Sequence, residues 1–156
     1  ELLHAESLPI FVQGSMPRQA LLQAFRETQG SILLATHSFW QGVDVRGAAL
    51  TCVIIDKLPF ASPEEPLAKA TMQAIEVAGG NGFVDYLLPQ AIISLNQGFG
   101  RLIRSETDRG LFVLGDPRIR SRPYGNVVMA SLPEMPWVDI EVAGQYLHEI
   151  SEPEGD

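Results

Sequence analysis

The residues best suited to chemistry lie between Gln97 and Gly110, in the string QGFGRLIRSETDRG. Apolar spacing predicts a helix over about Pro89–Arg104. A proline suits the first position of a helix, because the backbone N–H that it lacks would have no partner within the helix. At about 100° per residue, Gln97, Arg101 and Arg104 share one helical face. Two guanidinium groups there suit a polyanion, because each can bind phosphate oxygens in pairs; an ordinary solvated arginine face is the alternative. The opposite, core-facing stripe consists of Ile92, Leu95, Phe99, Leu102 and Ile103.

A second group of candidate residues lies in the segment THSFWQGVDVRG, from Thr36 to Gly47. It follows a continuous apolar run over residues 31–36, which predicts a buried strand. Gly42 permits a tight turn or the close approach of a ligand, and Asp44 places a carboxylate on that turn. Such a carboxylate can accept hydrogen bonds from ribose hydroxyl groups. A capped turn is the alternative for this glycine and aspartate.

Short apolar runs alternate along the chain with amphipathic stretches. The runs predict strands and the amphipathic stretches predict helices. This alternation indicates an α/β fold with an open, mostly parallel sheet and helices on both faces. In such sheets ligands bind at the loops after the carboxyl ends of the strands. We expect strands at 8–12, 31–36, 50–55 and 111–114, and helices at 17–30, 67–78, 89–104, 124–132 and 138–150.

Length and charge bound the domain organisation and the choice of partner. With 156 residues, of which 46% are hydrophobic, we expect one domain over residues 1–150 and an acidic tail at 151–156. The net charge of −8 argues against broad, nonspecific nucleic-acid binding. Six of the eleven basic residues nevertheless lie between positions 101 and 122, which predicts one local basic patch on an acidic body.

Several other side chains carry weaker signals. Cys52 is the single cysteine and is expected to be a buried structural thiol, so we expect no disulfide framework and no metal site. No apolar run reaches the length of a membrane span, the opening ELLHAES does not have the pattern of a signal peptide, and we expect a cytoplasmic protein. Asp116 is expected to pair with Arg118 or with an arginine of the 97–110 string. Trp137 is either a core residue or an exposed anchor for a partner.

The string from Gln97 to Gly110 resembles motif VI of superfamily 2 helicases, in the form of the iron–sulfur XPD/DinG group: Q-x-x-G-R-x-I-R-x-x-x-D-x-G. The segment at 38–47 resembles motif V of the DinG and YoaA branch, S-F-W-E-G-V-D-v-x-G, with Gln41 in place of the usual glutamate. The runs VIIDKLPFASPEEPLAKA, GDPR and RPYG are also similar to the YoaA branch. The resemblance thus covers most of residues 8–132.

This resemblance implies the second RecA-like domain of a 5′-to-3′ ATP-dependent DNA helicase that acts in DNA repair or replication. ATP would lie between the two RecA-like domains, with Arg101 and Arg104 as arginine fingers and Gln97 as a sensor of the γ-phosphate. Gly42 and Asp44 would contact the ribose or relay the nucleotide state. The DNA would meet Thr36, Ser38 and Trp40, although core packing is an equal alternative for the tryptophan.

In that family the first RecA-like domain carries the phosphate-binding loop, the Mg²⁺ site and the iron–sulfur cluster. This chain has neither G-x-x-x-x-G-K-[ST] nor a cysteine set, and we expect it to begin after motif IV. It therefore reads as a fragment that is inactive alone. The expected partners are single-stranded or forked DNA, the N-terminal RecA-like domain and the χ subunit of the replicative polymerase. The alternative is a non-catalytic RecA-like interaction module that docks a replication or repair partner.

Overall fold

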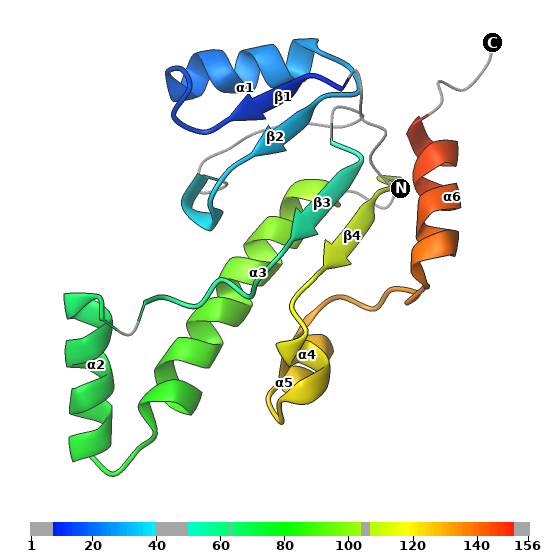
Figure 1. Ribbon diagram of the computed structural model, residues 1–156. Helices are drawn as coiled ribbons and strands as arrows, with labels where there is room; N and C mark the ends of the chain where they lie inside the picture. Colours follow the sequence, from blue (N-terminus) through cyan, green and yellow to red (C-terminus); the bar gives the residue numbers. More distant parts are fainter. Residues whose placement is uncertain (1–7, 40–49, 63, 104–106, 152–156) are drawn as a thin grey trace. The chain divides into compact units, whose positions relative to one another are not determined.

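The computed structural model describes residues 8–39, 50–62, 64–103 and 107–151. Strands and helices alternate along these residues, so the predicted α/β class is confirmed (Figure 1). The chain divides into two compact units. The first comprises Glu1–Cys52, Arg101–Leu111 and Asp139–Asp156, and the second comprises Val53–Gly100 and Phe112–Val138.

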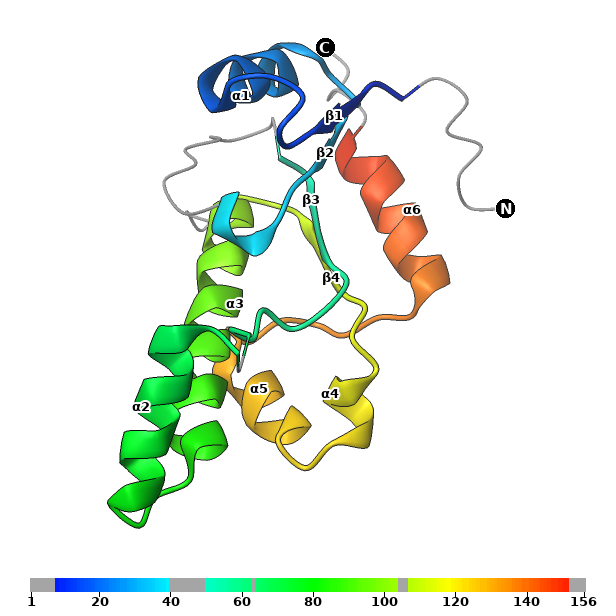
Figure 2. The ribbon, with the colours of Figure 1, turned by 60° about the vertical axis from the view of Figure 1, so that its left-hand side comes forward.

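The first unit contains a strand–helix–strand element. β1 (Ile10–Val12) and β2 (Ile32–Leu34) pair in parallel, with Ile10 opposite Ile32 and Val12 opposite Leu34. Parallel strands require a crossover connection, and α1 (Arg18–Glu27) provides it. Figure 2 shows α1 lying beside this pair. Both strands and the helix lie within the predicted ranges, but the predicted burial of the strand at 31–36 was wrong. Leu33 packs against the core, whereas Leu34, on the opposite face of the strand, is 51% exposed.

The core of the first unit forms on one face of α1. Leu21, Leu22 and Phe25 are buried on that face, as the spacing predicts. Burial of each such side chain stabilises the fold by about 1.5–3 kcal/mol. Beyond the helix, Gly30 adopts a φ of +68°, which L side chains rarely adopt, and the chain turns there into β2. Phe39 completes the cluster, against which Phe11, Leu33 and Leu50 also pack.

A second parallel pair consists of β3 (Cys52–Ile55) and β4 (Leu111–Leu114). The backbone N–H of Leu111 donates to the carbonyl of Thr51 (2.9 Å), and that of Gly115 donates to Ile55 (2.8 Å). The partners advance together along the chain, so the two strands run in the same direction. The Cys52 thiol is half-buried, less than we expected, and its burial raises its pKa.

Helices in the second unit connect β3 to β4. α2 (Pro66–Val77) begins with a proline at its first position and is followed by Gly79, whose φ is +88°. A π-helical turn, η3 (Phe83–Leu87), then runs directly into α3 (Leu88–Leu102). The sequence pattern misses this turn, which begins where the Asn81 side chain accepts hydrogen bonds from two backbone N–H groups (both 3.0 Å).

After β4, a short helix α4 (Arg118–Ser121) precedes α5 (Gly125–Ser131). Gly125 lies so close to the carbonyl of Ile119 that a Cβ atom could not fit there. An aromatic cluster of Phe60, Phe83 and Tyr124 packs in this unit, with ring centroids 5.2–5.8 Å apart.

The last helix, α6 (Ile140–Ser151), belongs to the first unit. It starts two residues later than predicted, because the Asp139 carboxylate accepts hydrogen bonds from the N–H groups of Glu141 (3.2 Å) and Val142 (3.0 Å). This is the usual role of an aspartate just before a helix. Within the described ranges, no helix is both long and apolar enough to span a membrane.

Candidate functional site

The predicted arginine face belongs to α3, whose other side is buried. Leu95 is fully buried and Leu102 is 5% exposed. Phe99 packs edge-on against Phe112 of β4, with ring centroids 5.4 Å apart. These contacts confirm the apolar stripe and fix the rotation of the helix. The side chain of Gln97, on the opposite face, is exposed.

α3 ends at Leu102, two residues before the predicted end at Arg104. Helical spacing therefore brings Gln97 and Arg101 onto one face, one turn apart. It does not extend to Arg104, which lies outside the described residues. Of the three residues predicted to share this face, the structure therefore describes only Gln97 and Arg101.

Arg101 is the most unusual side chain on this helix. It is half-buried, and its Nε atom is buried without a hydrogen-bond partner among the described residues. A buried donor left unmet costs about 1–3 kcal/mol, so native proteins rarely keep one without a reason. A guanidinium in this state can bind an anion at little further desolvation cost.

Gly110, the last residue of the 97–110 string, lies close to the side chain of a buried leucine. A Cβ atom at Gly110 would overlap the side chain of Leu102, the last residue of α3. A larger residue at this position, directly before β4, would require the buried Leu102 side chain to shift, so glycine is favoured there.

The second predicted group begins at the carboxyl end of β2. Thr36 donates to the Gln13 side-chain oxygen through its backbone N–H (2.9 Å) and its hydroxyl (3.0 Å). The next residues form a 3₁₀ turn, η1 (His37–Phe39), which contains the backbone of Ser38. The Arg18 guanidinium donates to the carbonyl of Phe39 (2.7 Å) and lies 5.2 Å from its ring.

Gln13 and Arg18 are positioning residues that sequence reasoning missed. Each acts across more than twenty residues of sequence, at a separation that local patterns do not reveal. The remaining predicted residues of this loop, Trp40, Gly42 and Asp44, lie outside the described residues, as does Gln41. Their contacts with ligand or protein stay predictions.

Asp116, in the second unit, resolves one of the open alternatives. The residue is 4% exposed, and its carboxylate accepts hydrogen bonds from Nη2 (2.6 Å) and Nε (2.9 Å) of Arg118 and from the backbone N–H of Leu58 (2.8 Å). The Arg118 side-chain hydrogen bond, mainly, holds the pKa of Asp116 well below its usual range. Asp116 in turn raises the pKa of Arg118. Its partner is therefore Arg118, whose guanidinium also lies 5.3 Å from the Phe60 ring.

Across the described part of the chain, no three His, Cys, Asp or Glu side chains gather into a possible metal site.

Comparison with known proteins assigns the family. The helicase C-terminal domain family matches residues 1–135. The ATP-dependent DNA helicase YoaA of Escherichia coli is 51% identical over 130 residues, which cover 83% of this chain and 20% of that protein. The ATP-dependent helicase DinG of Mycobacterium tuberculosis is 41% identical over 127 residues, covering 81% and 19%.

A further relative, named 3′-5′ exonuclease DinG, comes from Bacillus subtilis. It is 39% identical over 122 residues, which cover 78% of this chain and 13% of that protein. The chain thus spans about a fifth or less of the length of these relatives. These matches confirm the resemblance carried by residues 38–47 and 97–110. The chain belongs to the family of helicase C-terminal domains, and the relatives that are 41% and 51% identical to it are ATP-dependent helicases named DinG and YoaA.

Proposed function

We propose that this chain is the second motor domain of an ATP-dependent 5′-to-3′ DNA helicase that acts in DNA repair or replication. The observation that carries the proposal is Arg101, which keeps a buried guanidinium Nε without a partner on the face that also presents Gln97. A purely structural arginine would be expected to satisfy that donor within the protein. A phosphate oxygen of a bound nucleotide supplies the missing acceptor.

The proposed ATP site lies between this domain and a first RecA-like domain carried elsewhere in the complete protein. Arg101 and Arg104 act there as arginine fingers, stabilising the charge that develops on the transferred phosphoryl group. Gln97 senses the γ-phosphate, while Gly42 and Asp44 contact the ribose or relay the nucleotide state. The unmet Nε of Arg101 fits an anionic ligand of this kind.

The other cofactors are assigned to the first domain. Mg²⁺ would neutralise the phosphates from ligands in that domain. Clusters of the iron–sulfur type are commonly held by four thiolates, and this chain contains a single cysteine. An iron–sulfur cluster, where the complete protein has one, is therefore held by the first domain in this proposal.

The DNA would be single-stranded or forked and would meet the loop after β2. Thr36, Ser38 and Trp40 are the proposed contacts to its backbone or bases. Arg18 and Gln13 support this role, because they fix the backbone at the carboxyl end of β2, where ligands of parallel sheets gather. We further propose a cytoplasmic location and contact with the χ subunit of the replicative polymerase.

The test uses Arg104→Ala in the complete protein. Loss of one finger should lower the DNA-stimulated ATPase rate at least about tenfold and change nucleotide affinity little, which is the signature of lost transition-state stabilisation. Arg104→Lys should restore only part of the rate, because a point charge lacks the two-pronged geometry. Arg109→Ala is the matched control, since it removes an exposed arginine from an unspecified position of the same string.

A structural role for Arg104 would give the opposite result. The Arg104→Ala protein would then unfold more easily, and its folded molecules would keep the full ATPase rate. Equal losses for Arg104→Ala and Arg109→Ala would also contradict the proposal, because they would indicate a general effect of charge.

The second candidate is a non-catalytic RecA-like module that docks a replication or repair partner. Gln41 favours it, because the YoaA branch usually has glutamate there. The relative named a 3′-5′ exonuclease also supports it, because a similar domain occurs there in a protein named for another activity. Absence of DNA-stimulated ATPase from the folded complete protein would select this candidate.

A further inference from the structure

A hollow of about 610 Å³ lies in the second unit, just beyond the end of β4. Its volume is within the range of about 300–1,000 Å³ that is typical of small-ligand sites. None of the residues predicted to bind ATP or DNA contributes to it. The lining is mixed in character: Ile119, Met129 and Trp137 are apolar, whereas Arg120, Arg122 and Asn126 are polar.

The charge of the hollow is positive. Arg120 and Arg122 are exposed, and their side chains make no ion pair or hydrogen bond within the described residues. Asp116 also borders the hollow, but its buried carboxylate is already paired with Arg118 at 2.6 Å. Two guanidinium groups therefore remain to attract an anion, although the chain as a whole carries a net charge of −8.

Trp137 gives the hollow an aromatic wall. Its side chain is 55% exposed, so it is not the core residue that was one of its two predicted roles. An exposed indole beside arginines offers a flat surface for stacking next to donors for phosphate oxygens. Guanidinium groups bind phosphate in a bidentate manner, and their pairing with an aromatic platform is typical of sites for single-stranded nucleic acid.

We propose that this hollow binds one nucleotide unit of single-stranded DNA, with the base against Trp137 and the flanking phosphates on Arg120 and Arg122. The inference rests on the proposed function, because the helicase supplies the single strand. It adds a DNA contact in the second unit, separate from the proposed contacts after β2. The positive charge favours nucleic acid over an apolar protein segment, which would leave both guanidinium groups unmet.

The test measures binding of a labelled oligo(dT) to the complete protein without ATP, by fluorescence anisotropy at several salt concentrations. Trp137→Ala should weaken binding at least about fivefold, and Trp137→Phe should restore much of it because phenylalanine still stacks. Arg120→Gln with Arg122→Gln should lower the slope of log K against log salt by about 1.4, as expected for two lost phosphate contacts.

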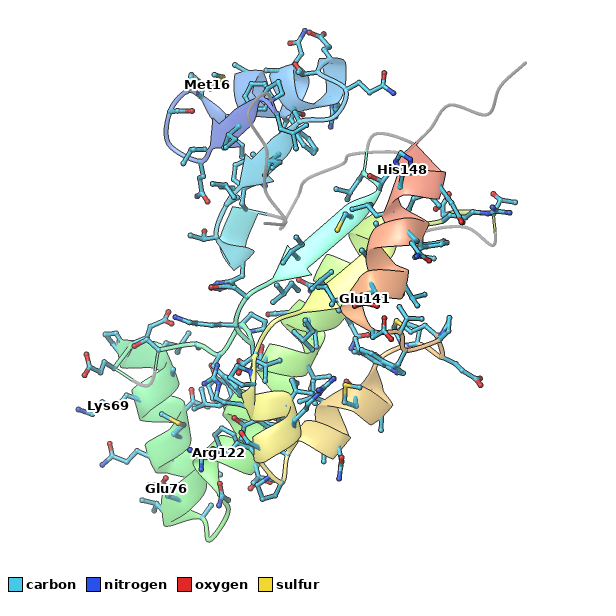
Figure 3. All side chains as sticks on the ribbon, turned by 45° about the vertical axis from the view of Figure 1, so that its right-hand side comes forward. Met16, Lys69, Glu76, Arg122, Glu141 and His148 are labelled. Atoms are coloured by element: carbon cyan, nitrogen blue, oxygen red, sulfur yellow. The ribbon has the colours of Figure 1, made fainter. Side chains whose placement is uncertain are left out.

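A charge-matched control is Lys57→Gln with Lys69→Gln, which removes two exposed cations of the same unit from outside the hollow. Figure 3 labels Lys69 on α2 together with Arg122. This control should leave the affinity and the salt slope close to those of the wild type. Thermal unfolding of every variant identifies any that fail to fold.

Three results would overturn the inference. The folded Trp137 and arginine variants could bind the oligonucleotide with unchanged affinity, or the lysine control could lose as much affinity as they do. The variants could also lose binding to a protein partner while their affinity for DNA stays unchanged. Free dTMP provides a further arm. If Trp137→Ala weakened binding of dTMP as much as binding of the strand, the hollow would be a site for free nucleotides. Variants that bind DNA like the wild type, in a protein with DNA-stimulated ATPase, would refute the hollow alone. Absence of ATPase from the wild type would instead refute the proposed function.

Discussion

Two arginines, at the end of α3 and just after β4, show opposite ways of keeping a guanidinium in a folded protein. Arg118 is paired within the protein, with two side-chain nitrogens on Asp116 and its guanidinium 5.3 Å from the centre of the Phe60 ring. Arg101 instead holds its Nε buried with no acceptor among the described residues. Arg118 thus has its acceptor within the described residues, whereas the Nε of Arg101 can gain one only from outside them.

The difference separates a structural arginine from one that we propose is functional. Breaking a satisfied buried pair leaves a buried polar group unmet, which destabilises the fold. Removing an unsatisfied donor removes an existing cost, so the fold should lose little. Both arginines lie in stretches similar to helicase sequences, and the contacts they make, rather than their residue type, distinguish them.

The largest expected effect concerns the chain by itself. If Arg101 completes a site whose phosphate-binding loop lies in another domain, the isolated 156-residue chain should not hydrolyse ATP above a buffer blank, with or without DNA. Phosphate release assayed on purified chain measures this. Turnover that persists through repurification would mean that the site is complete here, and the contrast with Arg118 would lose its basis.

A smaller effect is expected from the Asp116–Arg118 pair. Asp116→Asn or Arg118→Ala should lower the free energy of unfolding by about 1–3 kcal/mol, because each leaves a partner unmet. The part exposure of Arg118, 40% for its side chain, keeps the loss below that of a fully buried pair. Denaturant unfolding of each variant measures the change. The double variant should lose less than the sum of the two, and strict additivity would show that the pair is not coupled.

The smallest effect is the pH dependence of that pair. Because Arg118 depresses the pKa of Asp116 in the folded state, the ionised carboxylate stabilises the fold above its unfolded pKa of about 3.9. This contribution should decline as the pH falls below about 4. The stability difference between wild type and Asp116→Asn should therefore be constant near neutrality and narrow in acid. A difference that widened in acid would contradict the assigned direction.

Local patterns were sufficient for much of the fold. The apolar face of α1 correctly predicted Leu21, Leu22 and Phe25 as core residues, because helical periodicity is set by neighbours a few residues apart. The four strands were also predicted from a local pattern, because each coincides with a short run of apolar residues. In α3 the same periodicity predicted the buried stripe but not the end of the helix at Leu102.

Contacts between distant residues account for what the sequence could not predict. Gln13 and Arg18 reach the loop after β2 across 23 and 21 residues, respectively, and no short pattern connects them. The hollow likewise depends on Trp137 folding back beside Arg120 and Arg122. By contrast, the turn before α3 depends on local contacts, since the hydrogen bonds of Asn81 reach no further than Asp85, four residues on.

The most direct test of the central claim compares Arg101→Ala with Arg118→Ala in the complete protein. The DNA-stimulated ATPase rate per folded molecule and the thermal unfolding midpoint are measured for both. We expect Arg101→Ala to lower the rate at least about tenfold, with an unchanged or higher midpoint. Arg118→Ala should lower the midpoint and leave the rate unchanged. If Arg101→Ala instead lowered the midpoint and kept the wild-type rate, Arg101 would be a structural residue and the proposed arginine finger would be wrong.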